Sequence, residues 1–196
     1  MKFLKIMKEG FRVYSLNLAT FVLAVICATA GSIFIVTAPP LLFGLYYMGA
    51  KAARDEEVEL KDLLQGFKMF ISSWTYVIVV LTLLLTAPSI AYYLLSYLKI
   101  SVVASFLVVI SVLICWITLV TYSLVYAIPL IAGEDKKVFD AIKTSIKTAF
   151  KKFTTTVSLF ISLTLITVFI GWIPVFGPLV VIPYQIITYS KAAQEI

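Results

Sequence analysis

The chain lacks histidine altogether and has only two cysteines, Cys27 and Cys115, among its 196 residues. Charged residues are also scarce, at 13% of the chain. Metal sites and most acid–base catalysis depend on these residue types. Each cysteine lies alone inside an apolar run, where we expect it to pack as a small apolar residue. The sequence therefore predicts a protein that is not an enzyme and that has no cofactor and no metal site.

Charged side chains are missing from three long stretches, which are residues 13–50, 70–133 with the exception of Lys99, and 153–190. Hydrophobic residues make up 62% of the chain and its mean hydropathy is +1.05, which excludes a water-soluble globular protein. A membrane helix needs about 20 apolar residues, so each stretch is long enough for two crossings. Turn-forming residues near the middle of each stretch, at 39–40, 96–101 and 171–178, separate the two crossings.

The predicted fold is an all-α, polytopic membrane protein whose six transmembrane helices form three hairpins. The whole chain, 1–196, is a single membrane domain. We expect the membrane helices near residues 15–38, 41–54, 73–97, 102–131, 154–173 and 177–192. The second and the sixth are short, so the long side chains of Lys51, Arg54 and Lys191 are expected to snorkel toward the lipid headgroups.

The distribution of cations predicts the orientation. Of the 16 lysine and arginine residues, only Lys99 falls in a connection on the opposite face of the predicted bundle. The positive-inside rule then places both termini and the long connections in the cytoplasm. We expect a multi-pass protein of the cell membrane that exposes only three short turns on the outer side.

A short segment with helical periodicity precedes each predicted hairpin, near residues 3–14, 60–70 and 138–153. The third has lysines on the face opposite its apolar residues. A basic amphipathic helix of this kind lies in the membrane interface and attracts anionic lipid headgroups; the alternative is that it only covers the inner end of the bundle. Anionic lipid is the expected partner, nucleic acid is not, and the predicted headgroup ligands are Lys136, Lys137, Lys143, Lys147, Lys151 and Lys152.

These three segments also end alike, with a small residue, Phe, a cation, any residue and an aromatic residue, at 10–14, 66–70 and 149–153. We infer three internal repeats, approximately 1–56, 57–135 and 136–196, each an amphipathic helix followed by a hairpin. Because each repeat crosses the membrane an even number of times, an axis along the membrane normal would relate them. Chance similarity among segments rich in Phe and Lys is the alternative.

No ionisable residue lies in the middle of a predicted span, so a proton relay or a charged-substrate site has no candidate. Prolines within the spans free backbone carbonyls that an amide or a cavity could satisfy. An intramembrane polar groove is therefore conceivable, and simple helix kinks are the alternative. The candidate groove residues are Pro88, Pro129, Pro183, Tyr184 and Gln185.

Two segments carry a resemblance to known proteins. The run Pro-Leu-Leu-Phe-Gly-Leu-Tyr-Tyr at 40–47, with residues 54–57 and 62–70, resembles a pattern of uncharacterised prokaryotic multi-pass membrane proteins. The segments 127–131 and 140–145 are similar to the membrane domain attached to some bacterial glycerophosphodiester phosphodiesterases, in which the hydrolase is a separate domain. The resemblance implies a six-helix membrane domain and transfers no catalytic residue.

Three functions remain open from the sequence. The first is a non-catalytic protein that engages lipid or organises the membrane through its basic amphipathic helices. The second is a small transporter or channel for a neutral solute, and the third is membrane shaping by hairpins acting as wedges. A homo-oligomer also stays open, because small residues such as Gly31, Ser32, Gly44 and Gly49 serve an internal bundle or a dimer interface equally well.

Overall fold

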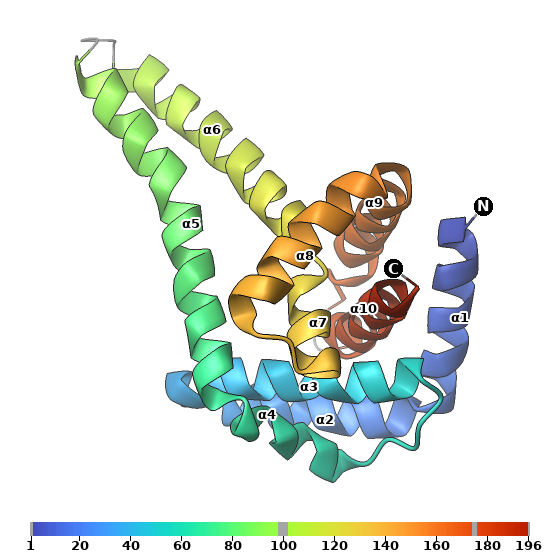
Figure 1. Cartoon of the computed structure of the whole chain (residues 1–196). Helices are drawn as coiled ribbons and strands as arrows, with labels where there is room; N and C mark the ends of the chain where they lie inside the picture. The colour runs from blue at the N-terminus through green and yellow to red at the C-terminus, as the bar shows by residue number, and fades with distance from the viewer. Residues whose placement is uncertain (1, 98–101, 174–175, 196) are drawn as a thin grey trace.

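The computed structural model describes residues 2–97, 102–173 and 176–195, and in these ranges the chain is helical without a strand (Figure 1). The predicted turn around Lys99 and part of the predicted turn at 171–178 lie outside the described residues. The all-α prediction is confirmed. The helices are α1 Lys2–Leu16, α2 Leu18–Gly31, η1 Ile35–Thr37, α3 Ala38–Ala53, η2 Leu60–Leu64, α4 Gln65–Lys68, α5 Phe70–Tyr97, α6 Val102–Ser123, α7 Ala127–Glu134, α8 Val138–Lys151, α9 Phe153–Ile170 and α10 Phe176–Gln194.

Consecutive long helices pack as antiparallel pairs, α2 with α3, α5 with α6, and α9 with α10. Figure 1 shows α5 and α6 as an arm that extends well beyond the other helices, while α2 and α3 lie side by side along another edge. The hairpins diverge from one another, and α3, α7 and α10 are the helices that pack together at the centre.

The first predicted span, 15–38, is shorter in the structure and begins after a sharp bend. α1 and α2 meet at an angle of 83°. Asn17 lies at this bend, and its Nδ2 donates to the carbonyl of Val13 (3.0 Å). An asparagine side chain that bonds to backbone in this way competes with helical pairing. At the far end of the hairpin, Thr37 Oγ1 donates to the Phe34 carbonyl (2.7 Å), and Pro39 and Pro40 occupy the first turn of α3, where proline is tolerated.

The fourth predicted span, 102–131, is interrupted at residues 124–126. Pro129 has no N–H to donate near the start of α7. Ser145, from α8, occupies the break: its Oγ donates to the Ser123 carbonyl (2.8 Å) and accepts from the Tyr126 N–H (3.2 Å). A side chain inserted into the helical hydrogen-bond ladder is a recognised cause of such a break.

The three predicted amphipathic segments each pack on the second helix of a different hairpin. α1 lies against α10, η2 and α4 lie against α3, and α8 lies against α7. Small residues make these contacts close: a Cβ at Gly66 would overlap the Pro40 carbonyl oxygen, and a Cβ at Gly10 would lie 2.6 Å from Thr188 Oγ1. α3 is consequently enclosed by η2, α4, α7 and α10.

The far ends of the hairpins expose large apolar side chains. Ile33 and Ile35 are 79% and 77% exposed, and Trp172 is 84% exposed. Apolar surface this extensive is typical of contact with a membrane. Among the described residues, three helical stretches are long and apolar enough to cross a bilayer, Phe70–Leu95, Val103–Glu134 and Phe153–Ile170, of which the second contains the break at 124–126. A fourth is counted if the bent pair Phe3–Leu16 and Leu18–Gly31 is one span. The chain is thus compatible with a membrane protein of three or four spans by length.

Helices α2 and α3 are each too short to cross a bilayer. α2 has 14 residues and α3 has 16, so each is only about 21–24 Å long at 1.5 Å per residue, against roughly 30 Å of hydrocarbon. Most of α3 is also covered by its neighbours, which leaves little of its surface for lipid.

We predict that Gly66→Ala destabilises the fold by roughly 1–3 kcal/mol, because the new methyl group meets backbone atoms of α3 that have no room to move. The measurement is the apparent melting midpoint in detergent. Gly31→Ala is the matched control, since a Cβ there meets only Leu41 Cδ1, the end of a flexible side chain. Equal midpoints for the two variants would contradict the close approach of α4 to α3.

Candidate functional site

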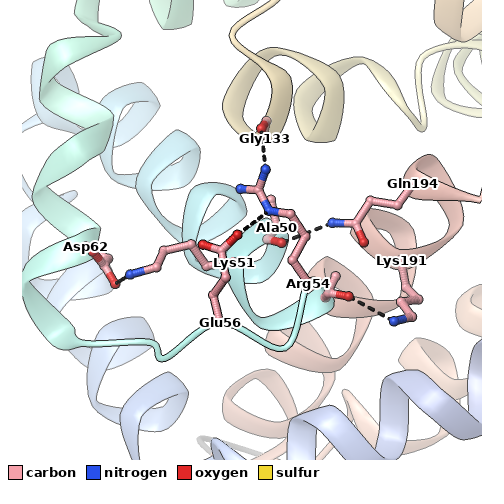
Figure 2. A network of polar contacts seen from close by, with 9 residues as sticks. Ala50, Lys51, Arg54, Glu56, Asp62, Gly133, Lys191 and Gln194 are labelled. Atoms are coloured by element: carbon pink, nitrogen blue, oxygen red, sulfur yellow. Dashed lines mark hydrogen bonds and ion pairs between the residues drawn. The ribbon is translucent and has the colours of Figure 1, made fainter.

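The C-terminal ends of α3, α7 and α10 meet at one end of the bundle, which we call the charged end (Figure 2). Polar side chains there donate to the last carbonyls of a neighbouring helix. Lys191 Nζ donates to Ala53 (2.9 Å), Gln194 Nε2 donates to Ala50 (3.1 Å), and Arg54 Nη1 donates to Gly133 (3.3 Å). These carbonyls have no partner within their own helix, so the three ends are joined by cross-helix caps.

The sequence predicts that Lys191 and Arg54 snorkel toward the lipid headgroups. In the structure both side chains instead turn inward and donate to backbone carbonyls. Arg54 Nε also pairs with Glu56 (3.0 Å). Sequence reasoning missed the capping role, although a cation in the last turn of a helix is a general signal for it. The sequence does not show which carbonyl comes within reach of each cation. For Lys191 the carbonyl belongs to Ala53, more than a hundred residues away along the chain.

Lys51 forms an ion pair with Asp62 of η2, with 2.8 Å between Nζ and Oδ2. The Asp62 side chain is 7% exposed and that of Lys51 is 19% exposed. Burial raises the pKa of Asp62, but hydrogen bonds from the Glu59 N–H and from Lys51 outweigh this and hold it below its ordinary value. The pair fastens η2 to the end of α3.

The six lysines predicted to bind headgroups fall into two groups. Lys136 pairs with Glu134 (2.8 Å), and Lys152 Nζ donates to the carbonyl of Glu195 (3.1 Å), so both have partners within the protein. The other four are exposed, and no ion pair among the described residues includes them. These four are Lys137, Lys143, Lys147 and Lys151.

Helix α8 presents three distinct faces. Its small residues Ala141, Ser145 and Ala149 are buried against the bundle. Phe139, Ile146 and Phe150 are exposed, at 68%, 39% and 51%. At about 100° per residue, these apolar positions lie roughly a quarter of a turn from the stripe formed by Lys143, Lys147 and Lys151. An interfacial helix has this arrangement, with an apolar face for acyl chains beside a basic face for headgroups.

The other two amphipathic segments repeat the pattern. In α1, Gly10 is buried while Phe11 and Arg12 are exposed, and in α4 the same is true of Gly66, Phe67 and Lys68. The small residue of each signature thus faces the bundle, and the phenylalanine and the cation face outward. α1 adds Leu4, Lys5 and Lys8 to its two exposed faces.

A cavity of about 530 Å³ lies between the hairpins, with walls from α3, α5, α6, α9 and α10. Of the five predicted groove residues, only Gln185 lines it. The Gln185 amide donates to Thr167 Oγ1 and to the Leu163 carbonyl, which joins α10 to α9. The cavity lining is otherwise mainly apolar, with hydroxyl groups from Thr118, Thr121, Thr164, Thr167, Tyr46, Tyr76 and Tyr189.

The other four predicted groove residues lie elsewhere. Pro129 and Pro183 are buried in α7 and α10. Tyr184 packs its ring edge-on against Phe11 and Tyr14, and its OH donates to the Met7 carbonyl (3.3 Å). Pro88 is half-buried in the α5 arm. The structure does not bring these four together with Gln185 in one groove.

In the part of the chain that the structure describes, no three His, Cys, Asp or Glu side chains lie close enough to hold a metal ion. Cys27 and Cys115 are both exposed thiols, on α2 and α6. The charged end thus offers cations, and the cavity offers hydroxyl and amide groups.

Comparison of the chain with family models, with curated proteins and with solved structures finds no match.

We predict that Asp62→Asn destabilises the fold by roughly 1–3 kcal/mol near neutral pH, because the half-buried Lys51 loses its charged partner. The pKa of Asp62 is lower in the folded state than its ordinary value of about 3.9. At a pH above that ordinary value the carboxylate therefore stabilises the folded state, and this stabilisation is lost as the pH falls through the folded-state pKa. Melting midpoints of wild type and variant should therefore converge below about pH 4. Lys61→Gln, which removes an exposed partner of Glu59, is the control and should leave the midpoint unchanged; a gap independent of pH would contradict the assignment.

Proposed function

We propose that this chain is a non-catalytic, multi-pass protein of the cell membrane that engages anionic lipid through basic amphipathic helices at its charged end. Its architecture would be three repeats, each an amphipathic helix and a membrane hairpin, with the charged end and both termini in the cytoplasm. The observation that carries the proposal is the three-faced helix α8, whose exposed lysines and exposed apolar side chains lie side by side.

The arrangement of the amphipathic segments supports the repeats. Each segment packs on the second helix of a different hairpin, α1 on α10, α4 on α3 and α8 on α7, so the three contacts follow one another in a cycle. In each, the small residue of the signature is buried. If the three sequence signatures were alike only by chance, there would be no reason for their small residues to be buried alike or for the three segments to pack on corresponding helices.

The exposed surface supports the membrane placement. Exposed apolar side chains such as Ile33 and Trp172 lie at the hairpin tips, whereas Lys51 and Lys191 lie in the last turns of α3 and α10. The short α2–α3 hairpin would reach less deeply than the α5–α6 arm, or the bilayer would thin around it. In either case α1, α4 and α8 would lie near the headgroup layer, where their cations would meet anionic lipid.

We predict that Lys143→Gln/Lys147→Gln/Lys151→Gln weakens the binding of anionic lipid by roughly 1 kcal/mol for each charge at low salt. Native mass spectrometry of protein released from nanodiscs that contain phosphatidylglycerol and phosphatidylcholine would count the anionic lipids retained. The triple Arg variant keeps the charge at the same positions and should retain them. Retention by the Gln variant, or no dependence on salt, would contradict the proposal.

A transporter or channel for a neutral solute is the second candidate, and the cavity between the hairpins favours it. Its volume of about 530 Å³ lies within the range of small-molecule sites, and its hydroxyl and amide groups could orient a neutral polar solute. The absence of charged residues among its lining side chains argues against a charged one.

For this candidate we predict that Gln185→Leu abolishes flux of a small neutral polar solute, such as glycerol, into proteoliposomes, because the amide has both N–H donors and a carbonyl acceptor, whereas each of the other polar side chains of the cavity has a single hydroxyl group. Asn17→Leu removes an amide at the bend outside the cavity and serves as the control. Wild-type flux no faster than that of empty liposomes, or equal flux in wild type and Gln185→Leu, would count against this function.

A further inference from the structure

A second hollow, separate from the cavity between the hairpins, lies on the surface between α6, α8 and α9 and has a volume of about 500 Å³. We call it the aromatic groove. Side chains of Leu119 and Cys115 form one wall, and those of Val157 and Phe153 form the other. Tyr122 lies at its base and is 7% exposed.

The aromatic groove is held in shape by its own contacts. The Tyr122 ring packs edge-on against Phe150, Phe153 and Phe160, with centroids 6.0, 6.1 and 5.9 Å apart. Its OH donates to the Ala149 carbonyl (2.8 Å). The neighbouring hydroxyl of Thr118 donates to the Ile114 carbonyl in its own helix. The groove therefore presents a preformed apolar surface whose hydroxyl groups already have acceptors.

The helix that contributes Phe150 to the groove also carries two exposed cations. Phe150 lines the groove, and Lys147 and Lys143 precede it by three and seven residues on the same helix, so the basic face of α8 runs alongside Phe150. Both lysines are exposed, and no ion pair among the described residues includes either of them. Asp140 lies one turn before Lys143 and is the nearest acidic residue along this face.

We propose that the aromatic groove is a site for one anionic phospholipid, with an acyl chain along Tyr122 and Val157 and the phosphate at Lys143 and Lys147. This inference rests on the proposed lipid-engaging function and specifies where and how one lipid is held. Charge complementarity selects the occupant, because a long apolar body ending in an anion fits an apolar groove that ends in two cations. The walls belong to α6 and α9, which are part of stretches long enough to cross a bilayer. In a membrane, lipid would therefore be the molecule that surrounds the groove.

The first test fills the groove. Val157→Trp should reduce the occupancy of a single retained phosphatidylglycerol by on the order of tenfold or more in native mass spectrometry, and Lys143→Gln/Lys147→Gln should remove the same lipid. Ile78→Trp, at an exposed position of α5, is the matched control and should retain it. Asp140→Asn should increase retention, because it removes the acidic neighbour of the two lysines.

The outcomes separate the two proposals. Loss of anionic lipid in the lysine variant but not in Val157→Trp would overturn the groove site and leave the lipid-engaging function standing. Retention in both would overturn both.

A second measurement covers the case in which Val157→Trp does not fold. Wild-type protein in nanodiscs is irradiated with phosphatidylglycerol that carries a photoactivatable group in its acyl chain, and the adducts are mapped by mass spectrometry. Adducts should concentrate at 114–122 and 150–161 and should be competed by unlabelled phosphatidylglycerol, but not by phosphatidylcholine or inorganic phosphate. Adducts spread evenly over α5, α6 and α9 would overturn the site, and competition by inorganic phosphate would assign the cations to a free anion.

Discussion

Three helix C-termini that meet in one place impose the constraint on which the rest of this structure depends. Each end of α3, α7 and α10 carries backbone carbonyls that its own helix leaves unpaired, together with the negative end of a helix dipole. Lys191 and Gln194 of α10 donate to two of these carbonyls in α3, and Arg54, directly after α3, donates to the last turn of α7. The hairpins are therefore tied together at the charged end by polar contacts, while their far ends diverge and expose apolar side chains.

Close backbone approach is the second requirement, and it determines what the protein can present outward. Gly66 and Gly10 let α4 and α1 lie directly on α3 and α10. In α8 the face against the bundle is narrow and carries the small residues Ala141, Ser145 and Ala149. The larger apolar side chains of α8, such as Phe139 and Phe150, are then free of the bundle and remain exposed beside its cations. A wider buried face would have used those side chains in the core and would have left no apolar surface next to the basic stripe.

The order of elements was predictable from the sequence, because apolar length and 3.6-residue periodicity are local properties. The hairpins, the amphipathic segments and the turn near Pro39 all follow from them. The break at 124–126 was not predictable, since it depends on Ser145 from a helix that packs there only in three dimensions. For the same reason the capping role of Lys191 and the aromatic environment of Tyr122 were missed, whereas the exposed lysine stripe of α8 was found.

Helix α6 links the two hollows of the structure. Ile117 and Thr121 face the cavity between the hairpins, Ile114 and Cys115 face the aromatic groove, and Thr118 lines both. The Thr118 hydroxyl is bonded to the Ile114 carbonyl of the same helix. A lipid in the groove would bear on this shared wall, and packed side chains transmit such displacements. Phe160 of α9 also lines both hollows. If both hollows bind ligands, occupancy of the groove would therefore alter the shape of the cavity through α6 and α9.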